Sequence, residues 1–266
     1  MSVTPLAELQ ELRCGPMSVR AAKLDQLVSL TKTRRPLVVL TGAGISTESG
    51  IPDFRSATGI WAQYDPMEVA TIDAFHADPA KVWEFYGRRL DVLGDAEPND
   101  GHRALAELEE RGWVQAVITQ NVDRLHTRAG SRRVVEVHGT IGTASCLDCG
   151  TVVAAEEMAA LLPVPACPEC GSVLKPDVVM FGELLPEAAV AEAVELAAHA
   201  GVLLVIGSSL EVYPIAGLPL ETLAAGGSLA IVNRGATQFD SRAAVTVDAG
   251  AGETVRALAE ALPERP

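Results

Sequence analysis

The sequence predicts an α/β protein: a doubly wound, Rossmann-like parallel sheet with a smaller lobe made of helices and a zinc ribbon. Short apolar runs end in polar turns, and amphipathic stretches lie between them. This alternation is typical of a parallel sheet covered by helices on both faces. Two stretches of the 266-residue chain break it, and one of them holds two C-x-x-C pairs. These two stretches predict the second lobe.

Four short apolar runs rich in β-branched residues are the expected strands of the sheet. They read as buried parallel strands because they are continuously apolar rather than alternating. Each is followed by turn-forming or polar residues, the first by Thr41-Gly42-Ala43-Gly44. Ligands of such sheets bind beyond the carboxyl ends of the strands, so these turns are the expected site. The runs are Leu37–Leu40, Val114–Ile118, Val202–Ile206 and Leu229–Val232.

Amphipathic stretches between the strands predict the helices. The first 30 residues are expected to be largely helical, with Leu24, Leu27 and Leu30 on one face. Further helices are expected over Pro79–Leu93, His102–Arg111, Glu187–His199 and Glu253–Leu262. The Rossmann-like domain is then predicted to comprise residues 1–51, 99–140 and 176–266. The small lobe is predicted to comprise residues 52–98 and 141–175, and it includes a cofactor loop, a helical insert and the zinc ribbon.

The composition excludes several classes of protein. Hydrophobic residues make up 48% of the chain, which is not the composition of a disordered segment. The 21 basic and 35 acidic residues give a net charge of −14, which disfavours nucleic acid or an anionic membrane as the main partner. No apolar run approaches the roughly 20 residues that span a bilayer. The N-terminal residues do not resemble a secretory signal, so we expect a cytoplasmic protein without a membrane anchor.

Four of the five cysteines form a metal-binding pattern. The pairs Cys146/Cys149 and Cys167/Cys170 give C-x2-C-x17-C-x2-C, and Gly150 and Gly171 follow the two pairs. Four thiolates form a closed tetrahedral shell, which predicts one structural Zn²⁺ rather than a catalytic one. A redox dithiol and unrelated buried cysteines are the alternatives.

The turn after the first strand is a candidate phosphate site. Gly42, Ala43 and Gly44 allow backbone amides to approach a pyrophosphate, and Ser46-Thr47-Glu48-Ser49 is expected to open a helix. Thr47 stands where the dinucleotide fingerprint has its third glycine, which weakens a hydride-transfer dehydrogenase as the interpretation. A plain strand-to-helix turn is the alternative.

Six segments together resemble the sirtuins, the NAD-dependent protein deacylases. The resemblance covers residues 42–210, with valine at 122 and serine at 208 where isoleucine and threonine are commoner. The segments are Gly42–Arg55, Thr119–His126, His138-Gly139, the four cysteines, Pro176–Glu183 and Gly207–Leu210. The resemblance implies that NAD is consumed as co-substrate, that nicotinamide is released, and that the acyl group of an acyl-lysine protein or peptide passes to ADP-ribose.

The resemblance also implies the roles of individual residues. His138 is the expected general base, with Asn121 as its catalytic companion, and an imidazole of near-neutral pKa suits that task. The peptide is expected to add as a strand beside Val179, Phe181 and Gly182, on one side, and Leu210–Tyr213, on the other. The residues expected to contact NAD are Gly42, Ala43, Gly44, Ser46, Phe54, Arg55, Gln120, Asn121, Asp123, Gly207, Ser208, Ser209, Asn233, Arg234 and Ala251.

One helix indicates which acyl group is removed. Tyr86 and Arg89 lie three residues apart, so they share a helix face. Arg89 can bind a carboxylate in bidentate fashion while Tyr86 donates a hydrogen bond. This Y-x-x-R resembles the desuccinylase-type branch, which implies removal of succinyl, malonyl, glutaryl and also acetyl groups. Asp53 departs from that branch and matches the deacetylase-like pattern.

Other functions remain open at this point. A deacetylase without acidic-acyl activity and a protein mono-ADP-ribosyltransferase use the same cofactor-binding residues. A zinc-ribbon binding module without catalysis is the alternative from a different class, and the charge of −14 opposes a nucleic-acid adaptor of that kind.

Overall fold

The computed structural model describes residues 16–264, and its centre is a six-stranded parallel sheet of order β3-β2-β1-β7-β8-β9. All five neighbouring pairs are parallel. Every residue of β1 and β7 is buried, because helices cover both faces. The strands are β1 (Leu37–Thr41), β2 (Val114–Thr119), β3 (Val134–Glu136), β7 (Val202–Ile206), β8 (Ser228–Val232) and β9 (Val245–Val247).

The carboxyl ends of the central strands meet at one edge of this sheet. Thr41 of β1 pairs with Thr119 of β2 and with Ile206 of β7, and Ile206 pairs with Val232 of β8. The segments that follow β1, β2, β7 and β8 therefore leave the sheet side by side. The polar turns predicted to bind a ligand are brought together in this way.

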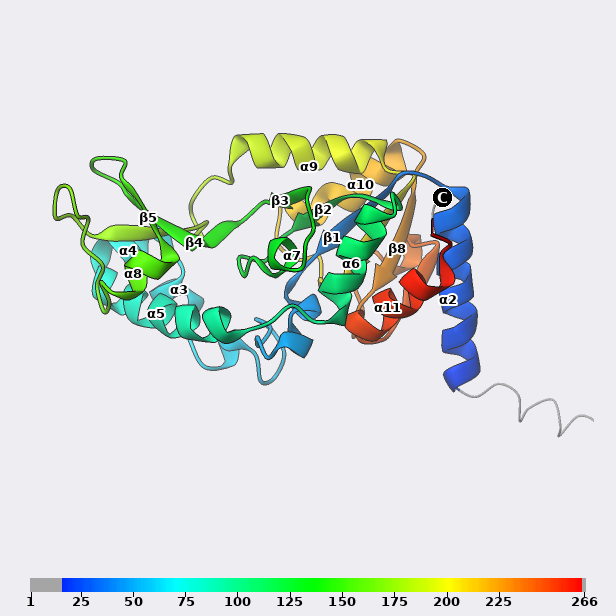
Figure 1. Cartoon of the computed structure of the whole chain (residues 1–266), viewed down its shortest axis with the longest axis horizontal. Coiled ribbons are helices and arrows are strands. Elements are labelled where there is room, and N and C mark those ends of the chain that lie inside the picture. Colours follow the sequence, from blue (N-terminus) through cyan, green and yellow to red (C-terminus); the bar gives the residue numbers. More distant parts are fainter. Residues whose placement is uncertain (1–15, 265–266) are drawn as a thin grey trace, which may run out of the picture.

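Helices form a layer on each face of the sheet (Figure 1). One apolar cluster joins the sheet to α2 (Pro16–Thr33), α6 (Asp100–Glu110) and α11 (Ala251–Ala261). The cluster on the opposite face joins it to α9 (Glu187–His199) and α10 (Leu218–Ala224). None of the helices in residues 16–264 has the length and apolar character needed to cross a membrane.

The small lobe lies at the other end of the long axis of the molecule (Figure 1). It has its own three-stranded antiparallel sheet, of order β5-β4-β6, and its own apolar cluster. The Nε1 of Trp83 donates to the carbonyl oxygen of Leu174 at 2.7 Å, which ties α5 to β6. The elements are α3 (Pro66–Val69), α4 (Ile72–Ala77), α5 (Pro79–Asp95), β4 (Gly139–Cys146), β5 (Val152–Ala154), α8 (Ala155–Ala159) and β6 (Leu174–Val178).

The predicted strands and the four later predicted helices are confirmed, with ends that differ by at most two residues. The N-terminal helix is confirmed over 16–33, and residues 1–15 lie outside the described residues. Strands β3 and β9 were not predicted, since each has only three residues, and neither was α10. The exact boundaries of the two domains stay a prediction.

Candidate functional site

One cavity of about 1120 Å³ lies at the carboxyl edge of the sheet, between the sheet and the small lobe. Its lining includes every residue predicted for cofactor, catalysis or substrate except Leu210, which is buried in the core. The four cysteines do not line it. Its lining includes Gly42, Ala43, Gly44, Ser46, Phe54, Arg55, Tyr86, Arg89, Gln120, Asn121, Asp123, His138, Val179, Phe181, Gly182, Gly207, Ser208, Ser209, Asn233, Arg234 and Ala251.

Two glycine turns form the floor of the cavity. The amide of Gly44 donates to the carbonyl oxygen of Gly207 at 2.8 Å. A Cβ at Gly44 would lie 2.7 Å from the Cα of Gly207, so the turns after β1 and β7 pack closely only because both residues lack side chains. The resulting surface exposes backbone rather than side chains, which suits close approach of a pyrophosphate.

The segment Ser46–Ser49, which was expected to open a helix, does not open an α-helix. Two single-turn 3₁₀ helices, Ala43–Ile45 and Thr47–Ser49, stand in its place. The physical reason is that the buried Ser46 turns inward to bind Asp123, and Gly50 then takes a left-handed conformation with φ 83°. Backbone amides, and not a helix dipole, are therefore what this turn offers an anion.

Ser46, Asn121 and Asp123 form one buried hydrogen-bonded group. The Ser46 hydroxyl donates to Asp123 Oδ2 at 2.6 Å, and Asn121 Nδ2 donates to Ser46 Oγ at 3.0 Å. Asp123 Oδ1 accepts from the amide of Leu125 at 2.9 Å. The carboxylate and the amide are thus fixed before any ligand arrives. Alongside them, Gln120 Nε2 donates to Ser208 Oγ at 2.8 Å, which joins the ends of β2 and β7.

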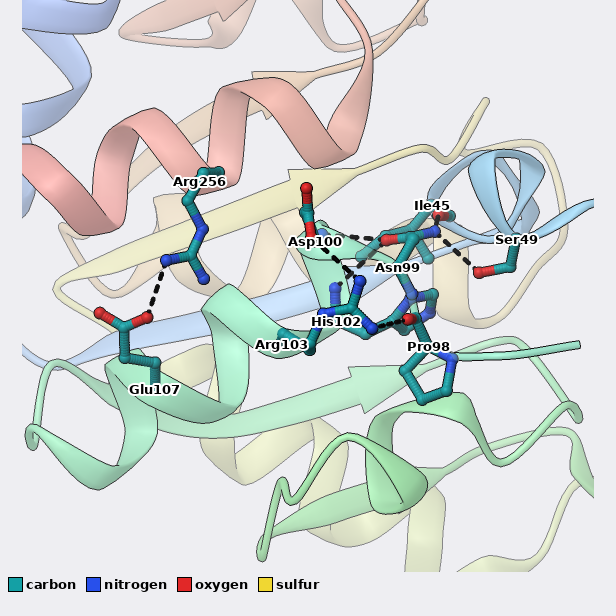
Figure 2. A network of polar contacts seen from close by, with 10 residues as sticks. Ile45, Ser49, Pro98, Asn99, Asp100, His102, Arg103, Glu107 and Arg256 are labelled. Atoms are coloured by element: carbon teal, nitrogen blue, oxygen red, sulfur yellow. Dashed lines mark hydrogen bonds and ion pairs between the residues drawn. The ribbon is translucent and has the colours of Figure 1, made fainter.

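A second group of contacts holds this one in place from the start of α6 (Figure 2). Asn99 Nδ2 donates to the carbonyl oxygen of Ile45 at 2.7 Å and to Ser49 Oγ at 3.0 Å. His102 Nδ1 accepts from the amide of Asn99 at 3.3 Å, which completes a capping box. His102 Nε2 lies 3.5 Å from Ser46 Oγ. The sequence motifs did not point to Asn99 or His102.

His138 has the tautomer and protonation state of a base. Its Nδ1 lies 3.1 Å from the carbonyl oxygen of Gln120, and a carbonyl can only accept, so Nδ1 carries the proton and Nε2 keeps its lone pair. Burial lowers the pKa of His138, although the hydrogen bond to Gln120 opposes this. The imidazole is therefore neutral at pH 7 and can accept a proton at Nε2.

The segment after β6 forms one wall of the cavity. The amide of Val179 donates to the carbonyl oxygen of His138 at 2.9 Å. Phe181 exchanges hydrogen bonds with the α3–α4 turn, donating to Ala70 at 2.9 Å and accepting from Ile72 at 3.0 Å. Gly182 then turns with φ 92°. Phe181 is 46% exposed, so this wall offers an apolar surface to a ligand.

Tyr86 and Arg89 both face the cavity from α5, as their spacing predicts. The Arg89 guanidinium lies 5.2 Å from the ring centroid of Phe54 and 5.7 Å from that of Phe85. Burial lowers the pKa of Arg89, and burial raises the pKa of Tyr86 to about 12. Within residues 16–264 no carboxylate forms an ion pair with Arg89. This end of the cavity thus holds a guanidinium with no ion-pair partner in residues 16–264, and a neutral phenol.

The opposite end of the cavity is more polar and more open. Asn233 Nδ2 donates to the carbonyl oxygens of Arg234 and Gly235, at 3.2 and 3.1 Å, which leaves its Oδ1 as a free acceptor within the described chain. Glu48 Oε1 accepts from the amide of Gly252 at 3.1 Å, near the start of α11. These groups suit a ribose or an adenine.

The four cysteines form two matching knuckles away from the cavity. Their sulfur atoms all lie within 4.8 Å of one another. The amide of Gly150 donates to the carbonyl oxygen of Cys146 at 3.0 Å, and the amide of Gly171 donates to the carbonyl oxygen of Cys167 at 2.9 Å. Both glycines are left-handed, with φ 78° and 80°, which lets the chain turn sharply after each cysteine pair. Four thiols at this spacing fit a tetrahedral Zn²⁺ with no open position, so the site fits a structural metal.

Several lining residues escaped the sequence analysis, among them Trp61 and Phe85. The ring of Trp61 lies between those of Phe54 and Phe85, with centroid distances of 5.1 Å to Phe54 and 6.1 Å to Phe85. Neither an aromatic residue in a short turn, such as Trp61, nor one on the apolar face of a helix, such as Phe85, is distinguished by local sequence from an ordinary core residue. Glu211 lies in the segment Leu210–Tyr213 that was expected to bind the peptide, but its ion pair with Arg55 at 2.9 Å is not revealed by any local pattern.

Comparisons with known proteins agree with this geometry. The sequence model of the Sir2 family matches residues 42–214. The chain is 47% identical over 239 residues to NAD-dependent protein deacylase 2 of Pyrobaculum aerophilum, covering 90% of this chain and 96% of that one. It is 48% identical over 240 residues to NAD-dependent protein deacetylase 1 of Geobacillus kaustophilus, covering 90% and 98%.

Solved structures give the same result. A Sir2 structure with a p53 peptide and NAD⁺ superposes with a TM-score of 0.83 at 42% identity, covering 89% of this chain and 97% of that one. A Sir2 structure bound to a propionylated peptide superposes with a TM-score of 0.82 at 42% identity, covering 90% and 98%. With a family match over most of the chain and relatives of this similarity, the chain belongs to the Sir2 family, the sirtuins.

Proposed function

We propose that this chain is an NAD-dependent protein-lysine deacylase that transfers the acyl group to ADP-ribose and releases nicotinamide. The observation that carries the proposal is the neutral His138, whose Nε2 is free in a cavity floored by two glycine turns. The names of the relatives support it, since they are NAD-dependent protein deacylases and deacetylases. Its partners are acyl-lysine proteins or peptides.

Each group in the cavity has a task in this reaction. NAD supplies the ribose carbon that receives the acyl oxygen, and nicotinamide is its leaving group. The glycine turns bind the pyrophosphate through backbone amides, and the buried Asn121 and Asp123 orient the nicotinamide ribose. His138 Nε2 accepts a proton from a ribose hydroxyl. Phe54 covers the reacting atoms and excludes water.

Substitution of His138 tests the proposal. We expect His138→Ala to lower kcat by about 10²- to 10⁴-fold, the usual contribution of a general base, while the far-ultraviolet circular dichroism stays unchanged. His199→Ala is the matched control, because His199 is exposed on α9. Mass spectrometry of the products identifies the reaction. Label from NAD that stays on protein, without acyl-ADP-ribose, would make the chain a mono-ADP-ribosyltransferase.

We further propose that the acyl pocket accepts succinyl, malonyl and glutaryl groups as well as acetyl. Arg89 supports this, because its guanidinium is half-buried and has no ion-pair partner in residues 16–264. The carboxylate of an acidic acyl group would offset the cost of keeping this positive charge away from water. Tyr86 keeps its proton, since its pKa is about 12, and can donate to the same carboxylate. Before a carboxylate binds, cation–π contacts with the rings of Phe54 and Phe85 stabilise the guanidinium.

The neighbouring arginine gives a matched control for this pocket. Arg89→Met is expected to lower kcat/KM for a succinyl peptide by about 10-fold or more, the value of a charge-assisted hydrogen bond, and to change the acetyl peptide much less. Arg88→Met should leave both rates unchanged, because Arg88 is exposed and pairs with Glu84 and Tyr64. Equal losses for both peptides in Arg89→Met would refute the acidic-acyl proposal and leave deacetylation in place.

The cytoplasm is the location we propose. Two knuckles of free thiols at metal-binding spacing fit a reducing compartment, where Zn²⁺ and not a disulfide joins such cysteines.

A further inference from the structure

An ion pair at the rim of the cavity connects the cofactor loop to the opposite wall. Arg55 Nε lies 2.9 Å from Glu211 Oε2, and both side chains are about half exposed. Among the ion pairs of residues 16–264 it is the only one whose two members both line the cavity. Arg55 comes from the small lobe, and Glu211 follows β7 of the sheet.

The backbone around Arg55 is already fixed by its own loop. Asp53 Oδ1 accepts from the amides of Arg55 and Ser56, at 3.0 and 2.8 Å. The amide of Trp61 donates to the carbonyl oxygen of Phe54 at 3.0 Å, which closes the loop. A Cβ at Gly59 would lie 2.8 Å from Asp53 Oδ1, so this closure needs glycine. The long Arg55 side chain is the part of the loop that these contacts leave free to rotate.

Glu211 fixes that side chain through one edge of the guanidinium. The carboxylate oxygen that meets Nε also accepts from Ser209 Oγ at 3.2 Å, so the carboxylate itself is held. A guanidinium has five N–H donors in one plane. Glu211 takes the Nε–H, and the Nη atoms of Arg55 form no hydrogen bond within residues 16–264. These remaining donors form the fork that binds two phosphate oxygens together.

We propose that Glu211 is a positioning residue that holds Arg55 so that its Nη donors face the pyrophosphate of NAD. This rests on the proposed function, in which NAD occupies the cavity. Glu211 also belongs to Leu210–Tyr213, the segment expected to pair with the peptide. The pair therefore joins the wall that binds peptide to the loop that covers NAD, and it sets the affinity for NAD rather than the rate of the chemical step.

Glu211→Gln tests this role, because it removes the charge and keeps the shape. An exposed ion pair is worth about 0.2–1 kcal/mol, so KM for NAD should rise by roughly 1.5- to 5-fold. The KM for NAD should change by a larger factor than kcat at saturating NAD or KM for the peptide, because the lost contact is the one that holds Arg55. The increase should shrink at high salt, since salt screens exposed pairs. Glu211→Asp, which keeps the charge, should restore part of the affinity.

Two controls separate positioning of Arg55 from a general loss of negative charge and from an effect on turnover. Glu187→Gln removes one exposed acid that has no ion pair in the described residues, and it should leave KM for NAD unchanged. Calorimetric titration with ADP-ribose measures the pyrophosphate contact without turnover, so it stays informative if the proposed reaction is wrong. An unchanged ADP-ribose affinity in Glu211→Gln, or an increase confined to KM for the peptide, would overturn the inference.

Discussion

The six-stranded sheet and the small lobe bury different kinds of side chain. The two clusters that flank the sheet are almost entirely aliphatic, with Trp113 and Phe239 as their aromatic members. The cluster of the small lobe contains Phe75, Trp83, Phe85 and Tyr86. The sheet is held by the parallel pairing of six strands, whereas the lobe has three antiparallel strands and two cysteine knuckles. This contrast indicates that the sheet can fold on its own core and that the lobe depends on a few specific contacts.

Removal of the metal site should have the largest effect, because it should destabilise the small lobe and leave the sheet folded. Cys146 and Cys167 are buried, and structural Zn²⁺ contributes on the order of 10 kcal/mol to small domains. We expect Cys146→Ser to abolish stoichiometric zinc binding, to expose the amides of residues 141–175 to hydrogen exchange and to abolish deacylation, while the sheet stays protected. Glu169→Gln, an exposed change inside a knuckle, is the control. Full protection of residues 141–175 after zinc loss would contradict the dependence of the lobe on metal.

The next largest effect should come from Trp83, which joins the two segments of the lobe. Trp83 is fully buried and donates to Leu174 at 2.7 Å. Trp83→Ala should lower the free energy of unfolding of the lobe by about 3–5 kcal/mol, and Trp83→Phe by about 1–3 kcal/mol, because the carbonyl of Leu174 loses its donor. Leu204→Ala in β7 should instead destabilise the sheet, and hydrogen exchange distinguishes the two regions. Identical exchange patterns in both variants would show that the regions unfold as one unit.

The two regions also differ in how far the sequence predicts them. The sheet and its helices follow from apolar runs and helical periodicity, both of which are local patterns. The place of Tyr86 and Arg89 on one helix face follows from spacing alone. The ion pair of Arg55 with Glu211 joins residues that are far apart in the chain, and the 3₁₀ turns at 43–49 depend on where the Ser46 hydroxyl finds its partner. Such features arise from tertiary contacts that no window of sequence contains.

Acid should lower the free energy of unfolding of the six-stranded sheet and its helices, because two buried histidines meet there. His102 and His126 lie with ring centroids 4.8 Å apart, and burial lowers the pKa of His102 to about 4 and that of His126 well below its ordinary value. The unfolded chain therefore binds more protons than the folded one below pH 6.5, so stability falls as the pH falls. His102 alone should cost about 2 kcal/mol between pH 6.5 and pH 5. Protonation of its Nδ1 would also break the capping box with Asn99.

Urea unfolding at pH 7.5, 6 and 5 measures this loss. His102→Asn should make the dependence on pH less steep, even if the variant is less stable overall. His199→Gln should leave the dependence as it is, because His199 is exposed. A free energy of unfolding that stays constant from pH 6.5 to pH 5 would mean that these histidines take up protons in the folded state.

The smallest expected effect concerns Arg124, where the sheet side touches the small lobe. Arg124 has φ 62° without being glycine, and its Cδ lies 2.7 Å from the place that a Cβ of Gly142 would take. A left-handed residue costs about 1–2 kcal/mol, a cost that asparagine reduces. Arg124→Asn should therefore raise the free energy of unfolding by about 0.5–1 kcal/mol, which thermal unfolding would show as a slightly higher midpoint, and it should leave kcat unchanged.

Leu210 is the other left-handed residue that is not glycine in the described part of the chain, with φ 55°, and it provides the matched test. Unlike Arg124, its side chain is fully buried in the cluster on the α9 face. Leu210→Asn relieves the same backbone strain but removes buried apolar surface and leaves a polar group in its place, so it should destabilise the chain by about 2–5 kcal/mol. If Arg124→Asn destabilised the chain as much as Leu210→Asn does, relief of backbone strain at position 124 would contribute nothing measurable to stability. Opposite signs would show that exposure of the side chain decides whether relief of the strain is visible.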